Sequence, residues 1–184
     1  MFEELKVIHY PDPRLRKISA KVARSDDRLK SLAARMLELM REHKGVGLAA
    51  PQVGENIRLF VINPSGTPED DRVYVNPELS EPGDGEEEGE EGCLSLPEIH
   101  ALVWRTTKLR IDAYDLDGKP FHDEQSGYIA RIWQHEFDHL NGTMITDRMA
   151  AVAKMGARKK LKDLEEEYLK MHPKPKATAR KRSG

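Results

Sequence analysis

His135-Glu136-Phe137-Asp138-His139 is the stretch that decides the structural interpretation of this chain. On a helix, side chains four residues apart lie on the same face, so the two histidines can bind one metal ion. Glu136 lies about 100° around the same turn, where its carboxylate can take a proton from a water activated by such a metal. A surface helix with two histidines is the alternative, but a second, apolar face predicts an enclosed helix. The residues of that face are Ile129, Ile132, Trp133, Phe137 and Leu140.

Two histidines leave a metal site incomplete, and the third ligand distinguishes the classes of enzyme that carry this motif. In metzincins a third histidine stands at the position that Ile145 occupies here, so this class is excluded. Downstream, Glu165, Glu166 and Glu167 would suit a thermolysin-like site. They lie in a segment rich in Lys and Glu, however, which is typical of an exposed helix face. The remaining candidate lies upstream, at Cys93.

Cys93 is the only cysteine in the chain and therefore cannot form an internal disulfide. A free cysteine is usually a small buried apolar residue. Here it follows an acidic, glycine-rich run, residues 84–92, which predicts a loop, and Leu94-Ser95-Leu96 then resumes an extended pattern. A thiolate and two neutral imidazoles suit a borderline-soft divalent metal, with the fourth position left for water. A solvated loop is the simplest interpretation of Glu91, and an acceptor for a ligating histidine is the alternative.

A third motif, Gly45-Val46-Gly47-Leu48-Ala49-Ala50-Pro51-Gln52, follows a predicted helix. Ser25-Asp26-Asp27 can cap the start of this helix, and Gly45 can supply its left-handed end. Beyond the helix, the exposed backbone around Gly47 and the amide of Gln52 suit an extended peptide and a developing oxyanion. Alone, the motif would also fit a helix end with a flexible loop. The apolar positions that predict the helix are Leu29, Leu32, Met36, Leu39 and Met40.

Taken in order, these three motifs resemble those of the peptide deformylase family. The resemblance includes Glu91-Gly92-Cys93-Leu94-Ser95 and the segment from Gln134 to Gly142. The segment from Tyr10 to Arg16 is also similar to the start of the family, and the resemblance covers roughly residues 5–150. The family removes the formyl group from the N-terminal formyl-methionine of nascent polypeptides and releases formate. The resemblance therefore implies a metal-dependent amidohydrolase that acts on linear amides.

The resemblance also implies a metal centre and its acid/base residue. Cys93, His135 and His139 would hold one metal ion per chain, and Glu136 would be the acid/base residue. The metal of the family is Fe(2+), with zinc, nickel or cobalt as substitutes. The ligand spacing alone suggests zinc.

Recognition of the substrate is expected to involve two further sets of groups. The resemblance implies that Gln52 and the backbone N–H of Leu94 polarise the formyl oxygen. The methionine side chain is expected in an apolar pocket, because residues one turn before the two histidines share roughly the metal-facing side of the helix. The expected substrate-binding residues are Val46, Gly47, Tyr128 and Ile132.

The composition fits a single domain of ordinary size. The chain has 184 residues, 34% of them charged, and a net charge of −2, so the overall charge favours neither nucleic acid nor membrane as a partner. No apolar run approaches the ~20 residues that a membrane span needs. The family-like segment begins within a few residues of Met1, which leaves no room for a signal or transit peptide. We expect a bacterial-type cytoplasmic protein; an organellar protein whose presequence had been removed would have the same features.

Between the motifs, β-branched and apolar runs predict short strands. Ser126 can cap the metal helix, which is predicted from about residue 127 to residue 140. The order of helix, strands, metal helix and final helix predicts an α+β fold with mainly antiparallel sheets around a central metal-binding helix, followed by a C-terminal helix. The predicted strands are 57–63, 72–75, 109–114 and 120–122, the last two joined by a turn at Asp117-Gly118.

The C-terminal part divides into a helix and a tail. Residues 152–171 have one apolar face, which predicts a peripheral amphipathic helix that ends before Pro173. We expect residues 1–171 to form a single catalytic domain and residues 172–184 to form a disordered basic tail. Solubility would explain the tail; electrostatic binding to the ribosome is the sharper hypothesis, because the substrates are nascent chains. The apolar face has Leu161, Leu164, Tyr168 and Met171, and the tail has Lys174, Lys176, Arg180, Lys181 and Arg182.

Two other classes of function fit parts of the sequence. A peptidase with the same histidine motif would cut internal peptide bonds, but Ile145 and the upstream cysteine disfavour it. A non-catalytic, metal-stabilised binding module would need a fourth protein ligand. His43, His100 and His122 are the candidates for that ligand.

Overall fold

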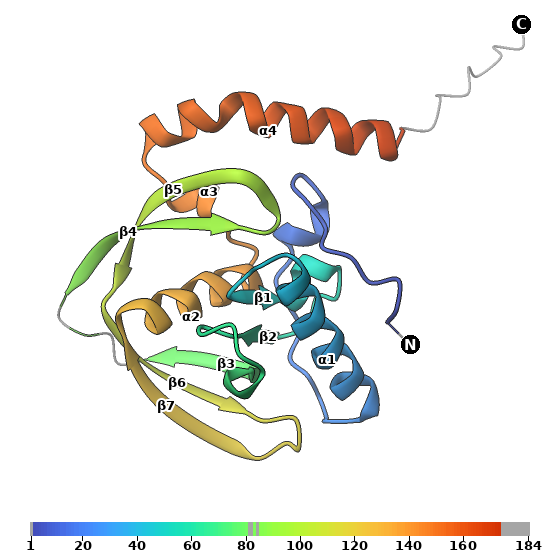
Figure 1. Cartoon of the computed structure of the whole chain (residues 1–184), viewed down its shortest axis with the longest axis vertical. Helices are drawn as coiled ribbons and strands as arrows, with labels where there is room; N and C mark the ends of the chain where they lie inside the picture. The colour runs from blue at the N-terminus through green and yellow to red at the C-terminus, as the bar shows by residue number, and fades with distance from the viewer. Residues whose placement is uncertain (1, 81–82, 84, 174–184) are drawn as a thin grey trace, which may run out of the picture.

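The computed structural model describes residues 2–80, 83 and 85–173 and has an α+β fold (Figure 1). Five strands form an antiparallel sheet in the order β1-β2-β3-β6-β7, and β4 and β5 form a separate antiparallel pair. Helix α2 lies between the two sheets, which confirms the predicted fold class. The strands are β1 (Gly47–Ala49), β2 (Leu59–Ile62), β3 (Arg72–Ser80), β4 (Glu86–Cys93), β5 (Leu96–Thr106), β6 (Lys108–Tyr114) and β7 (Pro120–Ser126). The helices are α1 (Asp27–Glu42), α2 (Gly127–Leu140), α3 (Ile145–Arg148) and α4 (Ala151–Met171), with 3-10 turns η1 (Pro13–Arg16), η2 (Ala50–Val53) and η3 (Pro68–Asp70).

Helix α2 is held in place by its apolar face. Ile132, Trp133 and Leu140 are buried against the five-stranded sheet, where the Trp133 ring meets the Tyr74 ring edge to face at 5.8 Å between centroids. Burying apolar side chains of this size contributes about 1.5–3 kcal/mol each, so this face fixes the rotation of the helix. Ser126 is the N-cap residue, but its side chain makes no capping hydrogen bond, so that part of the prediction is wrong.

The start of helix α1 is as predicted, whereas its end is not. The Asp26 carboxylate accepts a hydrogen bond from the Leu29 N–H at 3.0 Å and caps the helix. The left-handed residue after the helix is Lys44, with φ 56°, and not Gly45. Gly45 is required for a different reason: a Cβ there would lie 2.8 Å from Cδ1 of Leu94. The glycine therefore lets the helix end approach the turn that follows β4.

The loop predicted for the acidic run is wrong, because residues 86–93 form strand β4, paired along its length with β5. Strand alternation separates the acids: Glu88 and Glu90 are exposed, while Glu91 is buried. On the buried side, Arg131 donates hydrogen bonds to the Glu87 carbonyl at 2.8 Å and to the Glu91 carboxylate at 2.9 Å. These arginine contacts compensate the acidic charge, which allows the segment to lie in a sheet. After β4, residues 94–95 form a turn, and the extended pattern resumes only at residue 96.

The predicted hairpin is confirmed as β6 and β7, which pair from Lys108↔Ser126 to Tyr114↔Pro120. Strand β3 is longer than predicted because a bulge between Val75 and Glu78 lets it continue to residue 80.

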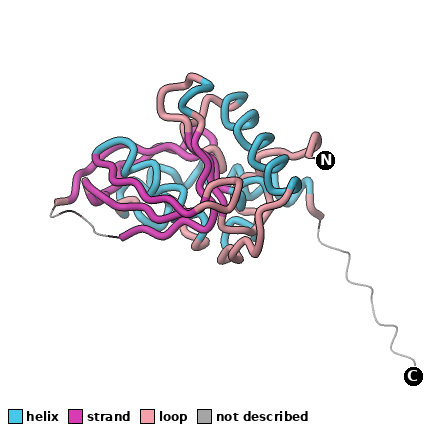
Figure 2. The backbone as a smooth tube through the Cα atoms, turned by 90° about the horizontal axis from the view of Figure 1, so that it is seen from below, coloured by secondary structure: helices cyan, strands magenta, loops and turns pink. Residues whose placement is uncertain are grey.

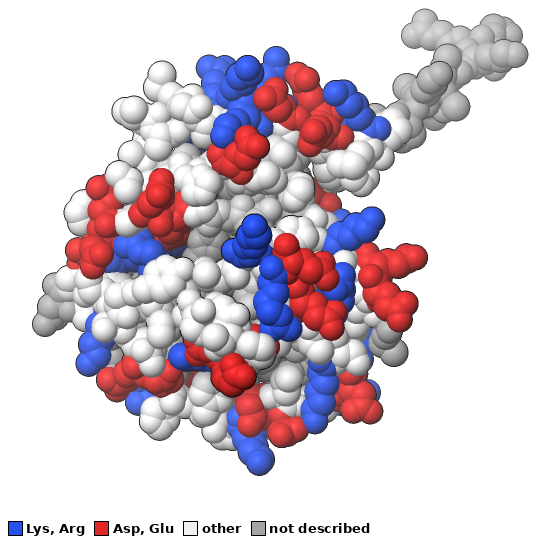
Figure 3. All heavy atoms as spheres, in the orientation of Figure 1, with Lys and Arg blue, Asp and Glu red and all other residues white. Residues whose placement is uncertain are grey.

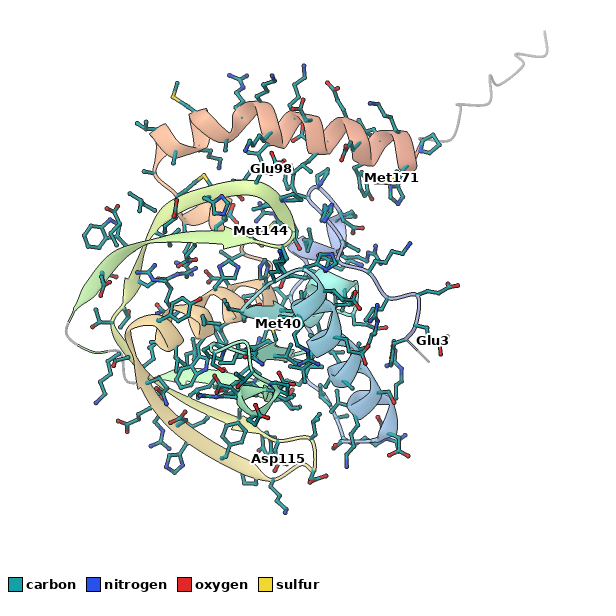
Figure 4. The ribbon with its side chains drawn as sticks, in the orientation of Figure 1. Glu3, Met40, Glu98, Asp115, Met144 and Met171 are labelled. Atoms are coloured by element: carbon teal, nitrogen blue, oxygen red, sulfur yellow. The ribbon has the colours of Figure 1, made fainter. Side chains whose placement is uncertain are left out.

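Helix α4 lies on the outer side of the β4–β5 pair (Figure 1). Leu161 and Leu164 pack on a core cluster that includes Met144, which is labelled below the β4–β5 pair in Figure 4. The Tyr10 hydroxyl donates a hydrogen bond to Glu165 at 2.6 Å and fastens α4 to the N-terminal segment. Met171, at the far end of the helix, is 70% exposed, so its assignment to the buried face is wrong. Lys and Arg gather over the first half of α4 and acidic side chains over the second half (Figure 3).

The strands gather in one half of the molecule, and the N-terminal segment lies on the opposite side (Figure 2). Among the described residues, no helix is both long enough and apolar enough to cross a membrane. The predicted basic tail falls on residues outside the described part, apart from residues 172 and 173.

Candidate metal centre and active-site cleft

Cys93, His135 and His139 meet where the end of β4 approaches α2. One ligand atom from each residue lies within 4.8 Å of the others, and Cys93 Sγ is 3.3 Å from Nε2 of His139. In the described part of the chain, this is the one group of three or more metal-binding side chains with such spacing. It includes neither the glutamates at 165–167 nor His43, His100 and His122. A thiolate with two imidazoles is a donor set that fits a borderline-soft divalent metal such as iron(II) or zinc.

Glu91 fixes one of the two histidines. Its carboxylate accepts a hydrogen bond from Nδ1 of His135 at 2.9 Å, which leaves Nε2 of that ring for a metal. Arg105 also donates to both carboxylate oxygens of Glu91, each at 2.9 Å. Burial opposes ionisation of Glu91, but the hydrogen bonds from Arg105 and His135 outweigh it and hold its pKa well below the ordinary value. The interpretation of Glu91 as part of a solvated loop is therefore wrong. Its position is that of the alternative, a hydrogen-bond acceptor for a ligating histidine.

Glu136 lies beside the metal ligands and is only 3% exposed. Its Oε2 atom has no hydrogen-bond partner in the described part of the chain. Burial raises the pKa of the Glu136 carboxyl to about 7; the nearby Glu91 carboxylate adds to the rise, and His135 opposes it. A Cβ at Gly47 would overlap the Glu136 carboxylate, which is why the motif has glycine at this position. A carboxyl group with this pKa is suited to proton transfer near neutral pH.

Gln52 lies in turn η2, where it is buried. Its side-chain oxygen accepts from the Ala49 N–H at 2.9 Å, which turns the amide nitrogen toward Ser95 Oγ at 3.3 Å and Cys93 Sγ at 3.5 Å. The N-terminal segment supports this arrangement, since the Ile8 N–H donates to the Gln52 carbonyl at 2.8 Å. A donor is therefore held next to the metal ligands.

One cleft of about 570 Å³ brings most of the predicted site residues together. Tyr128 and Val46 are partly exposed at the cleft, and Ile132 is buried deeper. His139 is the one predicted site residue that does not line the cleft; it lies behind it, buried. Of the predicted residues, those that line the cleft are Val46, Gly47, Gln52, Cys93, Leu94, Tyr128, Ile132, His135 and Glu136. Another hollow, of about 850 Å³, lies along β3, β6 and β7 and contains His122 but none of the three ligands.

Several residues of the site were not predicted in the positions they occupy. His9 lines the cleft, as do His43 and His100, which the sequence offered only as candidates for a fourth metal ligand. Burial lowers the pKa of His9, with His43 nearby adding to the effect. Arg105 and Arg131 hold Glu91 from positions 14 and 40 residues further along the chain. The sequence offers one local signal for this arrangement: alternate positions of a strand place Glu87, Gly89 and Glu91 on one face.

Comparison with known proteins agrees with this geometry. The family profile described as "Polypeptide deformylase" matches residues 4–155. The peptide deformylase of Chromobacterium violaceum is 42% identical over 90% of this chain and 98% of its own length. The rice protein "Peptide deformylase 1B, chloroplastic" is 43% identical over 89% of this chain, and the chain spans only 62% of that longer relative.

Solved structures show the same similarity. A crystal structure of peptide deformylase from Plasmodium falciparum has a TM-score of 0.89 and 40% identity, and the match covers 92% of this chain and 100% of that one. A peptide deformylase from Legionella pneumophila has a TM-score of 0.83 and 40% identity, with 93% and 99% covered. The family profile and these relatives together show that the chain belongs to the polypeptide deformylase family.

Proposed function

We propose that this chain is a metal-dependent hydrolase that removes the formyl group from the N-terminal formyl-methionine of nascent polypeptides and releases formate. The observation that carries the proposal is one cleft in which Cys93 and His135, with His139 behind them, lie next to the buried carboxyl of Glu136. Bacterial relatives named peptide deformylase support it, because the chain spans nearly their whole length.

The metal would be Fe(2+), one per chain, with zinc, nickel or cobalt as substitutes. When bound, a cation of this kind activates a water for attack by lowering its pKa to roughly 7. The protein groups that would hold the cation are the Cys93 thiolate and one nitrogen of each histidine. The hydrogen bond from His135 to Glu91 fixes which nitrogen of that ring remains free.

Glu136 would act as the acid/base residue. Its carboxylate takes a proton from the attacking water, the water oxygen bonds to the formyl carbon, and the carbon–nitrogen bond breaks. Glu136 then delivers the proton to the leaving amine, so formate and a free N-terminus result. A buried position, with no competing hydrogen-bond partner for Oε2 among the described residues, leaves the carboxyl available for both transfers.

The formyl oxygen would be held by Gln52 and the backbone N–H of Leu94. The Gln52 amide nitrogen makes a long contact to Ser95 Oγ, at 3.3 Å, and lies 3.5 Å from Cys93 Sγ, so its donor is available beside the metal ligands for a developing negative charge. Leu94 follows the ligand Cys93 directly, which places its N–H beside the same site.

The methionine side chain would enter a pocket formed by Val46, Tyr128 and Ile132, which all line the cleft. Strand β1 is an edge of the five-stranded sheet, and Gly47 is its first residue, so the peptide can be laid against its backbone. In this arrangement the apolar walls select methionine, and the edge of β1 binds the backbone of the substrate peptide whatever its sequence.

An assay of three peptides tests the proposal. A formyl-Met peptide should yield formate, while an acetyl-Met peptide and an unmodified Met peptide should remain unchanged. A peptidase would instead cut internal bonds of all three, and a binding module would release nothing. Metal analysis of protein purified without oxygen would identify the resident ion; absence of formate from the iron-loaded enzyme would overturn the proposal.

We also propose that residues 1–171 form the catalytic domain of a bacterial-type cytoplasmic enzyme and that the tail, residues 172–184, binds the ribosome. The five positive charges of the tail would bind phosphate with a strong dependence on salt. Truncation after Met171 should leave hydrolysis of a short formyl peptide unchanged and weaken co-sedimentation with ribosomes at low salt. Equal co-sedimentation of the truncated and full-length proteins at every salt concentration would show that the tail serves only solubility.

A further inference from the structure

The charged groups that hold His135 continue beyond Glu91 to the other side of α2. Arg105, which is 3% exposed, grips Glu91 with Nε and Nη2 and donates its Nη1 to the Asp138 carboxylate at 2.6 Å. Asp138 is also gripped by Arg148 from helix α3, whose Nε donates at 2.5 Å and whose Nη2 donates to the second oxygen. The charges therefore alternate without a break from Arg148 to the ring of His135.

Arg148 is the member of this series of ion pairs that reaches the surface. Its side chain is 44% exposed, whereas those of the three groups between it and His135 are 10% exposed or less. It lines a hollow of about 230 Å³ together with Trp104, Gln134 and Phe137. That hollow shares no lining residue with the active-site cleft. Arg148 is therefore not in contact with that cleft, and its hydrogen bonds connect it to the metal centre through the buried Asp138 carboxylate.

The geometry gives Arg148 a specific task. It is the donor to Oδ1 of Asp138, so without it that buried oxygen loses its bidentate partner. Asp138 then no longer fixes the orientation of the Arg105 guanidinium group. That group donates to both oxygens of Glu91 and so orients the Glu91 carboxylate. We propose that Arg148 is a positioning residue for the metal centre, which acts through Asp138, Arg105 and Glu91 on the orientation of His135.

Arg148 could also serve only to fasten α3, and the chain contains a matched control for that possibility. Arg16 pairs with Asp147, the residue before Arg148, and donates to Oγ1 of Thr146 at 3.4 Å. This contact also fastens α3, but it does not reach Asp138. Arg16 also donates to the Gly142 carbonyl, in the loop after α2. Replacing Arg16 therefore loosens α3 and this loop but leaves the ion pairs of Arg148, Asp138, Arg105 and Glu91 in place.

The experiment compares the release of cobalt(II) to an excess of a chelator by the wild type, Arg148→Ala, Arg148→Lys and Arg16→Ala. Release should be about 3–10-fold faster for Arg148→Ala, less than the ~10–100-fold expected when a direct partner of a ligand is removed. Arg148→Lys keeps the positive charge but cannot donate two parallel hydrogen bonds to the carboxylate. Its rate of cobalt release should therefore lie between those of the wild type and Arg148→Ala. Added methylguanidinium should slow release from Arg148→Ala, because the surface hollow admits it. The absorption bands of the cobalt–thiolate centre should shift in the same order.

Arg16→Ala should lower the melting temperature and leave cobalt release as in the wild type. The proposal is overturned if both Arg148 variants release cobalt at the wild-type rate, or if Arg16→Ala releases it as fast as Arg148→Ala. If Arg148→Ala does not fold, the comparison of Arg148→Lys with Arg16→Ala decides. These measurements do not involve hydrolysis, so they stand whether or not the proposed deformylase activity is found.

Discussion

Helix α2 and strand β4 supply the two halves of the metal centre, and they are held by opposite means. Helix α2 presents His135, Glu136 and His139 from a helix anchored by apolar packing, with Trp133 fully buried. Strand β4 presents its ligand at the end of a segment that is almost entirely acidic and is held by arginines and by pairing with β5.

This difference predicts how each half responds to substitution. On α2 the packing is independent of the reacting groups, so one of them can be removed with little change in the position of the others. On β4 the carboxylate of Glu91 is both a structural ion-pair partner and the orienting group of a ligand. A change there should therefore alter metal binding and stability together.

The largest effect is expected for Glu136 on α2, the proposed acid/base residue. Glu136→Ala should retain the metal and lose ~10²–10⁴-fold in the rate of formyl-peptide hydrolysis, because positioned acid–base groups contribute about that much. Rates and metal content measured on the same preparation would test this. Glu90→Ala is the matched control, since Glu90 is an exposed acid that lines the same cleft. Wild-type turnover by metal-replete Glu136→Ala would remove Glu136 from the mechanism.

Cys93→Ala should show the contrasting behaviour of the β4 half, with metal affinity and activity lost together. The thiolate supplies one of the three ligands, so its removal should weaken binding by more than the ~10–100-fold typical of an orienting partner. Titration with zinc or cobalt, alongside the hydrolysis assay, would measure both losses. A metal-replete and active Cys93→Ala protein would show that Cys93 is not a ligand.

The two halves also differ in how far the sequence could predict them. Helix α2 could be predicted because the spacing of its histidines and that of its apolar residues agree with one helical period. In β4 the acids occupy both faces, so hydrophobic periodicity carried no signal, and the run read as a loop. The arginines that make the strand possible come from β5 and α2, and such non-local partners cannot be read from a local pattern.

The end of α1 shows the same limit on a smaller scale. A glycine after a helix is typical of a left-handed end, but here Lys44 takes that conformation. Gly45 is needed for its close approach to Leu94, 49 residues away in the sequence, and that requirement appears only in the folded chain. The spacing of the two histidines on α2 is local and could be predicted, whereas the reason for Gly45 depends on a distant partner and could not.

Glu91→Gln would sharpen the comparison between the two halves. The change keeps the shape of the side chain and removes the charge that orients His135, so metal affinity should fall by ~10–100-fold. Glu90→Gln is the matched control on the exposed face of the same strand and should leave the affinity unchanged. Competition with a chromophoric chelator would measure both variants. Equal affinities for the two variants would mean that the Glu91 contact does not support the metal site.

The two carboxyl groups should also give the metal-free protein opposite dependences on pH. Burial raises the pKa of Glu136 from 4.5 to about 7, so the folded state holds a proton that the unfolded state releases. Its contribution to stability is therefore present below pH 4.5 and declines as the pH rises toward 7. For Glu91, the hydrogen bonds from Arg105 and His135 outweigh burial and keep the pKa below 4.5. Its contribution is present above pH 4.5 and is lost as the pH falls through the folded pKa.

Melting temperatures of the metal-free wild type, Glu136→Gln and Glu91→Gln between pH 3 and 8 would separate these two terms. The stability advantage of the wild type over Glu91→Gln should shrink below about pH 4.5, because the unfolded chain then takes up a proton at Glu91 that the folded state, with its lowered Glu91 pKa, does not bind. Relative to Glu136→Gln, the wild type should instead lose stability as the pH rises from about 4.5 to 7. In that range Glu136 is protonated in the folded state and ionised in the unfolded state. Parallel curves for all three proteins would mean that neither carboxyl changes its pKa on folding. The effect should be small beside the loss of rate or of metal, because only the proton affinity of one group changes in each variant.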